Sequence, residues 1–201
     1  MNYLAHIYLS GDDDDIMLGN FMADGIKGRR HEDYSPKIQQ GILLHRFIDD
    51  FTDFHPIVLE TKILFRPKYS KLAPILVDIL YDHYLAKNWQ QYHTTPLDQF
   101  VCETYKTLQA RWDELTPRIQ FMLPHMIENN WLYNYQFKEG IERVMFGMSR
   151  RVRYGDVLKD GWDDLQPVYE QVGEQFSRFF IQLRSEVSAW IKQYETKNAG
   201  Q

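Results

Sequence analysis

Two carboxylates and an imidazole, those of Asp78, Asp82 and His83, interrupt an otherwise apolar stretch over residues 76–85. Taking an unpaired carboxylate out of water costs a large free energy, so a fold that buries these groups must pair them, hydrate them or supply a cation. On a helix, a step of four residues turns through about 400°, which places Asp78 and Asp82 on one face, where they could share a ligand. His83 lies about 100° further round the helix. Of these three residues, Asp78 is the one that we least expect to bind a cation directly, because it is turned away from His83.

A second pair of the same kind, His45 and Asp49, stands one helical turn apart in the segment 41–49. Two helices that carry such pairs could face each other across a shared cation. Imidazole and carboxylate ligands with open positions for water suit Mn²⁺, Fe²⁺ or Zn²⁺ better than Ca²⁺, which prefers oxygen ligands alone. Water bound to such a cation becomes a nucleophile, so the sequence predicts metal-assisted hydrolysis. The alternative is a buried network of hydrogen bonds among these side chains.

Further candidate residues lie outside these two pairs. His6 and Asp24 each stand among apolar neighbours and could be ligands, although a hydrogen-bonded core histidine and a helix-end carboxylate are the simpler interpretations. Two basic clusters, Lys27–Arg30 and Arg150–Arg153, could hold a phosphate because arginine donates two parallel hydrogen bonds to it. Either cluster could instead be a solvated helix end. The acidic run Asp12–Asp15 is expected to be a solvated helix start without a chemical role.

Other common catalytic motifs are absent from the sequence. There is no phosphate-cradling GxxxxGK[ST], no dinucleotide-binding GxGxxG, no GxSxG nucleophile elbow and no HExxH zinc motif. The Glu-x-x-His motif of ferritin-like di-iron bundles is absent as well. Hydrolysis by a metal-activated water therefore remains the predicted chemistry.

The composition is that of a globular domain, because 44% of the 201 residues are hydrophobic and 15% are aromatic. The formal net charge of −5 gives no general attraction for nucleic acid, and we expect no nucleic-acid partner. A single cysteine, Cys102, excludes an internal disulfide and indicates a reducing compartment. The sequence has no apolar run of about 18 residues for a membrane span and no export signal at its start, so we expect a cytoplasmic protein without a membrane partner.

Apolar residues recur at intervals of three and four through most of the chain, a spacing typical of helices. A hydroxyl residue before a proline, as at Ser35-Pro36 and Thr116-Pro117, places a capping group at a helix start. We predict an all-α fold with a single compact multi-helix domain over residues 1–196 and a polar tail over residues 197–201. The predicted helices cover residues 12–25, 36–54, 56–66, 71–89, 96–114, 117–129, 137–149 and 164–195.

Five segments stand out when the sequence is considered as a whole: Met1–His6, Gly19–Asp24, Gly41–Asp49, Asp78–His83 and Gly147–Arg151. Together they resemble the acyl carrier protein phosphodiesterase family, over most of the chain. That family is described as a helical relative of the HD phosphohydrolases, which cut phosphate esters with metals held by His and Asp. The resemblance implies an HD-domain-like fold and the removal of 4′-phosphopantetheine from holo-acyl carrier protein, which leaves the apo-carrier.

The resemblance also implies roles for individual residues. It implies a metal site formed by His45, Asp49, Asp82 and His83, with His6, Asp24 and Asp78 in or next to it. We expect catalytic roles for Asp24, His45, Arg46, Asp82 and His83, and substrate binding by Lys27, Arg150 and Arg151. The arginines would neutralise charge on the phosphoryl oxygens. The expected cofactor is a divalent metal, first Mn²⁺, with Mg²⁺, Fe²⁺ or Zn²⁺ as alternatives. The adjacent pair Asp82-His83 departs from the HD enzymes, in which His precedes Asp.

Two other functions stay open at this point. One is an HD-type phosphohydrolase that acts on a nucleotide or another small phosphate ester through the same metal site. The other is a non-catalytic helical binding protein whose buried His and Asp residues form only structural hydrogen bonds. A holo-acyl carrier protein substrate is small and acidic, so the two basic clusters are the predicted docking residues, and salt should weaken binding. The sequence predicts no oligomeric state.

Overall fold

Helices make up the regular structure of residues 1–198, which are the residues described by the structure, a computed structural model, and no strand occurs among them. The α-helices are α1 (Tyr3–Leu9), α2 (Asp14–Met22), α3 (Pro36–Phe54), α4 (Pro56–Tyr69), α5 (Ala73–Lys87), α6 (Leu97–Ala110), α7 (Pro117–Glu128), α8 (Trp131–Asn134), α9 (Lys138–Ser149), α10 (Gly161–Leu165) and α11 (Tyr169–Asn198). Short 3₁₀ helices join them: η1 (Ala23–Gly25), η2 (Gly28–Asp33), η3 (Ser70–Leu72), η4 (Trp89–Gln91), η5 (Trp112–Glu114), η6 (Gly155–Asp160) and η7 (Gln166–Val168).

The predicted all-α class and the single compact domain are confirmed. All eight predicted helices occur, whereas α1, α8 and α10 are additional short helices that the sequence pattern did not indicate. Helix α11 continues through Lys197 and Asn198, the first residues of the predicted polar tail, and the rest of that tail lies outside the described residues.

Two of the predicted helix starts depend on proline. Helices α3 and α7 begin at Pro36 and Pro117, because the fixed φ of proline suits the first helical position and its missing N–H is not needed there. Ser35 and Thr116 occupy the positions before them, but neither hydroxyl makes the expected capping hydrogen bond. Asp13 does cap its helix: its carboxylate accepts two backbone N–H groups from the first turn of α2.

Helices α2 and α3 approach each other very closely because each carries a glycine at the contact. A Cβ atom on Gly19 would lie 2.2 Å from a backbone carbonyl oxygen of α3, and a Cβ atom on Gly41 would lie 2.1 Å from one of α2. A larger residue at either position would push the helices apart. The close contact brings Asn20 of α2 against His45, which lies one turn beyond Gly41 on α3.

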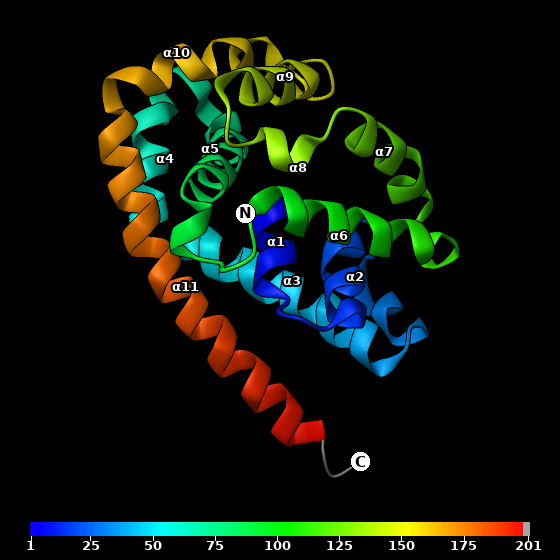
Figure 1. Ribbon diagram of the computed structural model, residues 1–201. Helices are drawn as coiled ribbons and strands as arrows, with labels where there is room; N and C mark the ends of the chain where they lie inside the picture. Colours follow the sequence, from blue (N-terminus) through cyan, green and yellow to red (C-terminus); the bar gives the residue numbers. More distant parts are fainter. Residues whose placement is uncertain (199–201) are drawn as a thin grey trace.

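Helix α1 lies inside the molecule, with the N-terminus near the centre and α5 beside it (Figure 1). Leu4 and Ala5 are fully buried. The first turn of α1 is held by Asp82 of α5, whose two carboxylate oxygens accept the backbone N–H groups of Asn2 and Leu4 at 3.2 and 2.8 Å. A carboxylate is favourable there because the N–H groups of a first turn lack helical partners. This contact fixes the position of α1, and with it that of His6.

Helix α11 runs along one side of the molecule, past α4 and α5 and on to α3 (Figure 1). Its inward face follows the spacing of three and four residues and buries Phe176, Phe179, Phe180, Leu183 and Val187. Helices α7, α8 and α9 lie on the opposite side of α5 in the same view. Among residues 1–198, none of the helices has the length and apolar character needed to cross a membrane.

Candidate active site

Four side chains from α1, η1 and α3 converge. His6 Nε2 lies 3.2 Å from Asp49 Oδ1, and His45 Nε2 lies 3.1 Å from Asp49 Oδ2. Asp24 Oδ1 lies 3.4 Å from the same nitrogen of His45. His6, His45 and Asp49, which we call the ligand cluster, each offer one atom within 4.8 Å of the others, a spacing that suits a single metal ion. The structure thus brings together four of the predicted site residues, His6, Asp24, His45 and Asp49.

Both imidazoles of the ligand cluster are oriented by Asn20, a fully buried residue of α2. Its side-chain Oδ1 lies 2.8 Å from His6 Nδ1, and its backbone oxygen lies 2.9 Å from His45 Nδ1. Because both partners are acceptors, each Nδ1 must carry a proton, and each Nε2 is left to face Asp49. The amide nitrogen of Asn20 donates to Ser10 Oγ and to the backbone oxygen of His6, which holds the amide in this orientation. Asn20 therefore sets the tautomer of a neutral His6.

The charges in the ligand cluster favour a cation. Burial and the neighbouring His45 lower the pKa of His6 to about 4, so its ring is neutral at pH 7 and its Nε2 directs a lone pair at Asp49. Burial opposes ionisation of Asp49, but His45 and His6 hold the pKa of its carboxyl well below the usual range. Burial also disfavours charge on His45, yet its hydrogen bonds to Asp24 and Asp49 raise its pKa to about 9. His45 is therefore protonated at pH 7 in the absence of a metal ion, and a divalent ion that displaced this proton would receive lone pairs from both Nε2 atoms and from an oxygen of Asp49, so these residues fit a metal ion.

The ligand cluster lines a cleft of about 790 Å³. Helices α5, α7 and α9 and the segment 131–135 supply its walls, with apolar side chains that include Ile75, Ile79, Met122, Tyr135, Val144 and Met148. Four carboxylates line the cleft, those of Asp24, Asp49, Asp53 and Asp78, together with the guanidinium groups of Arg118, Arg143 and Arg151. A concave, mostly apolar site with a few convergent charged groups is the usual form of a small-molecule or substrate-arm site.

The structure does not bring Asp82 and His83 to the cleft. Asp82 is fully buried, both of its oxygens accept N–H groups of α1, and burial raises its pKa to about 7. His83 has Nδ1 2.8 Å from the backbone oxygen of Tyr135 and Nε2 2.8 Å from the hydroxyl of Tyr169. Both residues thus take part in buried hydrogen bonds, the alternative that the sequence left open. The metal ligand set implied by the resemblance is not assembled as a whole.

Asp78 and Arg46 also differ from their expected places. Asp78 lines the cleft, although it was the least expected ligand of its helix, and its Oδ1 lies 3.1 Å from the amine nitrogen of Met1. Burial raises the pKa of the Asp78 carboxyl despite that amine. Arg46 does not line the cleft, because its guanidinium donates to the backbone oxygens of Ile26 and Gly28 at 3.0 and 2.8 Å. It anchors the loop that follows Asp24.

The predicted substrate-binding residues separate into two groups. Arg151 lines the cleft, whereas Lys27 is exposed outside it and Arg150 lies over the ring of Phe146, 5.9 Å from its centroid. Two arginines that do not stand out in the sequence, Arg118 and Arg143, line the cleft as well. Helical spacing in the sequence could have indicated both arginines. Positions 118, 122 and 125 share one face of α7, and positions 143 and 147 share one face of α9, with Arg151 four residues further on, just past the end of that helix.

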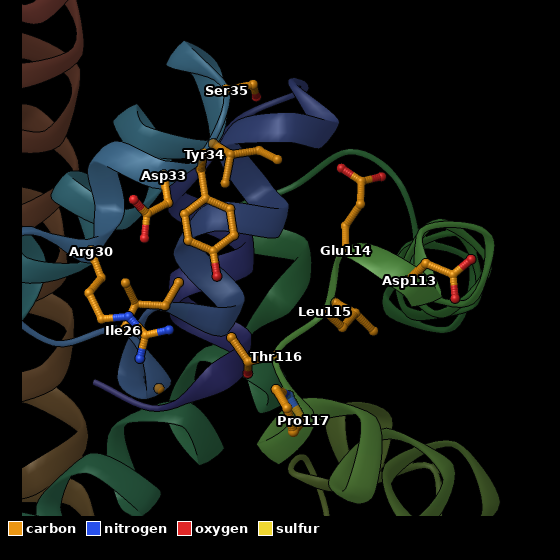
Figure 2. Close-up of a pocket in the computed structure, with 12 residues that line it drawn as sticks. Ile26, Arg30, Asp33, Tyr34, Ser35, Asp113, Glu114, Leu115, Thr116 and Pro117 are labelled. Atoms are coloured by element: carbon orange, nitrogen blue, oxygen red, sulfur yellow. The ribbon is translucent and has the colours of Figure 1, made fainter.

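A second cavity, of about 610 Å³, lies between residues 25–38 and 113–117. Figure 2 shows Arg30 and Tyr34 on one side of it, and Asp113 and Glu114 on the other. The buried hydroxyl of Thr116 has no hydrogen-bond partner there. The basic cluster at 27–30 thus contributes Arg30 to this cavity rather than to the cleft. No member of the ligand cluster lines it, so we assign the chemistry to the cleft.

Comparison with known proteins agrees with the resemblance drawn from the five segments. Residues 1–183 match the family model described as acyl carrier protein phosphodiesterase. The chain belongs to the acyl carrier protein phosphodiesterase family. The acyl carrier protein phosphodiesterase of Klebsiella pneumoniae (strain 342) is 37% identical over 184 residues, which cover 91% of this chain and 95% of that protein. Its counterpart in Shigella boydii serotype 4 (strain Sb227) is 32% identical over 189 residues, or 94% and 98% of the two chains.

A third member of the acyl carrier protein phosphodiesterase family, from Enterobacter sp. (strain 638), is 34% identical over 184 residues, with 91% of this chain and 95% of that protein covered. No solved structure matches the chain, so the HD-domain-like topology stays a prediction. The region matched by the acyl carrier protein phosphodiesterase model contains the ligand cluster and all the residues that line the cleft.

Proposed function

We propose that this protein hydrolyses the phosphodiester that joins 4′-phosphopantetheine to a serine of holo-acyl carrier protein, releasing apo-carrier and free 4′-phosphopantetheine. The names of its relatives support this activity. The observation that carries the proposal is the convergence of His6, His45 and Asp49 in a cleft that also holds Arg118, Arg143 and Arg151. Groups that would hold a metal ion and groups that would bind a phosphate thus line the same cleft.

The carboxylates of the cleft support a metal-dependent reaction. Asp24, Asp49, Asp53 and Asp78 all line it, and carboxylate oxygens are ligands that divalent cations accept. The ligand cluster, with two imidazoles and one carboxylate, would hold a divalent transition metal, and Mn²⁺ remains our first expectation. Such an ion would polarise a phosphoryl oxygen and lower the pKa of a water molecule. Asp24 and Asp78 lie close enough to bind or orient the groups around it.

The arginines of the cleft would bind the phosphodiester and stabilise its transition state. A guanidinium donates paired hydrogen bonds to phosphoryl oxygens and keeps its charge at any physiological pH. Arg118 lies 3.5 Å from Asp24 Oδ2, so it also holds that carboxylate in the cleft beside His45. Hydrogen-bond donors that are already in position before the reaction stabilise the charge that develops on the phosphoryl oxygens in the transition state. The oxygen of the carrier serine leaves, and a proton must reach it from water or from a side chain of the cleft.

Docking of the carrier needs a basic surface on a protein whose net charge is −5. Arg118, Arg143 and Arg151 are exposed while they line the cleft, and Arg150 and Arg153 are exposed on either side of Arg151 in the sequence. An acidic partner would therefore be drawn to the mouth of the cleft, and salt would slow its association.

The proposed function is tested by incubating the protein with holo-carrier and Mn²⁺, Zn²⁺ or Mg²⁺, with a chelator as the metal-free arm. Intact-mass spectrometry of the carrier reports the loss of 4′-phosphopantetheine. We expect apo-carrier in at least one metal arm and none with the chelator. A metal-loaded protein that leaves holo-carrier intact but cleaves a small phosphate ester would favour the small-substrate alternative. Binding of no metal at all would favour a non-catalytic protein.

A further inference from the structure

Gly147 lies within α9 and lines the cleft. Glycine weakens the interior of a helix relative to alanine, because it loses more backbone freedom on folding. Several other glycines of residues 1–198 have a visible reason to be glycine. Gly11 and Gly28 have positive φ, and a Cβ atom on Gly140 would lie 1.9 Å from the backbone oxygen of Asn134.

Neither reason applies to Gly147. Its φ is not in the positive region, and an added Cβ atom would meet no atom within 4 Å. The packing of the protein therefore leaves open space at this point of the cleft wall. A methyl group at this position would extend into that space without a clash.

The surroundings of this open space suit an extended chain of methylene and amide groups. Val144 and Met148 of α9 and Ile75 of α5 supply apolar walls in the same cleft, and Arg151 stands one turn beyond Gly147. Asn129 also lines the cleft, and because its side-chain nitrogen donates to the backbone oxygen of His125, its Oδ1 remains to accept from an amide N–H of a ligand. The bare backbone of a glycine lets a ligand chain approach the helix closely.

We propose that the groove over Gly147 binds the pantetheine arm of the substrate, and that the missing side chain at position 147 sets the width of this groove. The inference rests on the proposed function and makes it more specific: the phosphate lies toward the ligand cluster, and the arm runs along α9. Gly147 is then a specificity-determining residue that contacts substrate through its backbone.

Two substitutions and one matched control test this inference. Gly147→Ala adds a methyl group to the groove, and Gly147→Leu fills it. Glu139→Leu places the same new side chain on an exposed position of α9 outside the cleft. Each variant is compared with the wild type by melting temperature, by calorimetric affinity for free 4′-phosphopantetheine, and by turnover of holo-carrier and of methyl 4-nitrophenyl phosphate, a diester without an arm.

We expect Gly147→Ala to stabilise the fold and Gly147→Leu to weaken binding of the arm. Gly147→Ala should raise the melting temperature by about 2–4 °C, because alanine favours the helix and meets no clash. Gly147→Leu should weaken 4′-phosphopantetheine binding and raise the KM for holo-carrier by about tenfold or more, since the groove is filled. In Gly147→Leu, turnover of the armless diester should fall much less than turnover of holo-carrier, because the filled groove excludes the arm and adds nothing to the reacting groups. Glu139→Leu should behave as the wild type in the binding and turnover assays.

The outcomes separate this inference from the proposed function. A folded Gly147→Leu protein that binds 4′-phosphopantetheine and turns over holo-carrier as the wild type does would overturn the groove and leave the function standing. A wild type that never cleaves holo-carrier would overturn the function, and the groove would then be judged by 4′-phosphopantetheine binding alone. Binding that is lost in Gly147→Leu and kept in Glu139→Leu supports the groove, whereas no binding to the wild type overturns it.

Discussion

The imidazole rings of His6 and His45 stack with their centroids 4.0 Å apart, although they come from different helices. Two such rings would repel if both were protonated, which contributes to the low pKa of His6. Each ring has its Nδ1 beside an oxygen of Asn20 and its Nε2 beside an oxygen of Asp49. The pair is therefore arranged before any ion binds, with both Nε2 atoms facing the same carboxylate. Such prior arrangement lowers the cost of assembling a metal site.

Metal binding should depend on Asp49 and not on Asp50, the next residue in the sequence. Asp49→Asn keeps the shape of the side chain but removes the negative charge shared by both histidines, so the affinity for Mn²⁺ or Zn²⁺ should fall on the order of 100-fold. Calorimetric titration of the metal-free protein measures this affinity. Asp50→Asn is the matched control, because Asp50 is exposed and lies outside the cleft. Equal affinities in the two variants would contradict the assignment of the ligand cluster.

Asn20 should act on the metal through the histidines. Asn20→Ala removes the acceptor for His6 Nδ1 and leaves buried polar groups unpaired, which should cost about 1–3 kcal/mol of stability. Because the tautomer of His6 is then no longer fixed, metal affinity should also fall by about 10- to 100-fold. Nitrogen chemical shifts of the imidazoles report the tautomer directly. Ser10→Ala is the control: it removes a hydrogen bond to Asn20 but leaves the Nδ1 contacts. Loss of metal affinity in both variants to the same degree would reduce Asn20 to a purely structural role.

The sequence predicts most of the fold, because long amphipathic helices with proline or aspartate at their starts carry a strong pattern. The sequence pattern does not predict helix α1, because its seven residues are buried on nearly all sides and so show no polar face. Its place depends on the tertiary contact with Asp82. Short helices such as α8 and α10 depend on their neighbours for the same reason.

The candidate site is only partly predictable from the sequence. His45 and Asp49 lie one turn apart on a single helix, so their meeting follows from helix geometry. The approach of His6 depends on how α1 packs, and spacing alone cannot report it. Asp82 and His83 have the residue types of metal ligands, yet their partners turn out to be backbone groups and a tyrosine hydroxyl. Residue type predicts which groups need a partner, while the packing decides which partner they find.

His83 should make stability depend on pH. Burial lowers its pKa from 6.5 to about 4, so between these values the unfolded chain binds a proton that the folded protein does not. The stability linked to His83 is therefore present above pH 6.5 and is lost as the pH falls toward 4. His83→Gln removes this effect. As the pH falls from 6.5 to 4, the free energy of unfolding of the variant should therefore rise relative to that of the wild type, by up to about 3 kcal/mol.

The comparison must use the difference between the two proteins, because Asp82 acts with the opposite sign. Burial raises its pKa from 3.8 to about 7, so its contribution is present below pH 3.8 and is lost as the pH rises toward 7. Denaturant unfolding of wild type and His83→Gln across this range measures the difference. A constant difference at all pH values would show that His83 titrates normally in the folded protein.

Arg150 and Arg151 should contribute differently to the turnover of holo-carrier, although they are adjacent in sequence. Arg151 lines the cleft, so Arg151→Ala should lower kcat/KM for holo-carrier about 100-fold through the loss of a donor to the phosphoryl oxygens. Arg150 lies over Phe146 outside the cleft, so Arg150→Ala should lower kcat/KM less than about threefold, the effect expected of an exposed charge. Steady-state kinetics at fixed ionic strength compares them. The reverse order of effects would place the phosphate elsewhere.

The central claim is that the ligand cluster is the centre at which holo-carrier is cleaved. The most direct measurement is the intact mass of holo-carrier after incubation with Mn²⁺ and either the wild type or Asp49→Asn, at equal concentrations of folded protein. We predict that the wild type converts the carrier to its apo form and that Asp49→Asn leaves it holo. Conversion by both proteins at similar rates would contradict the account, because the reaction would then not need the carboxylate that joins His6 to His45.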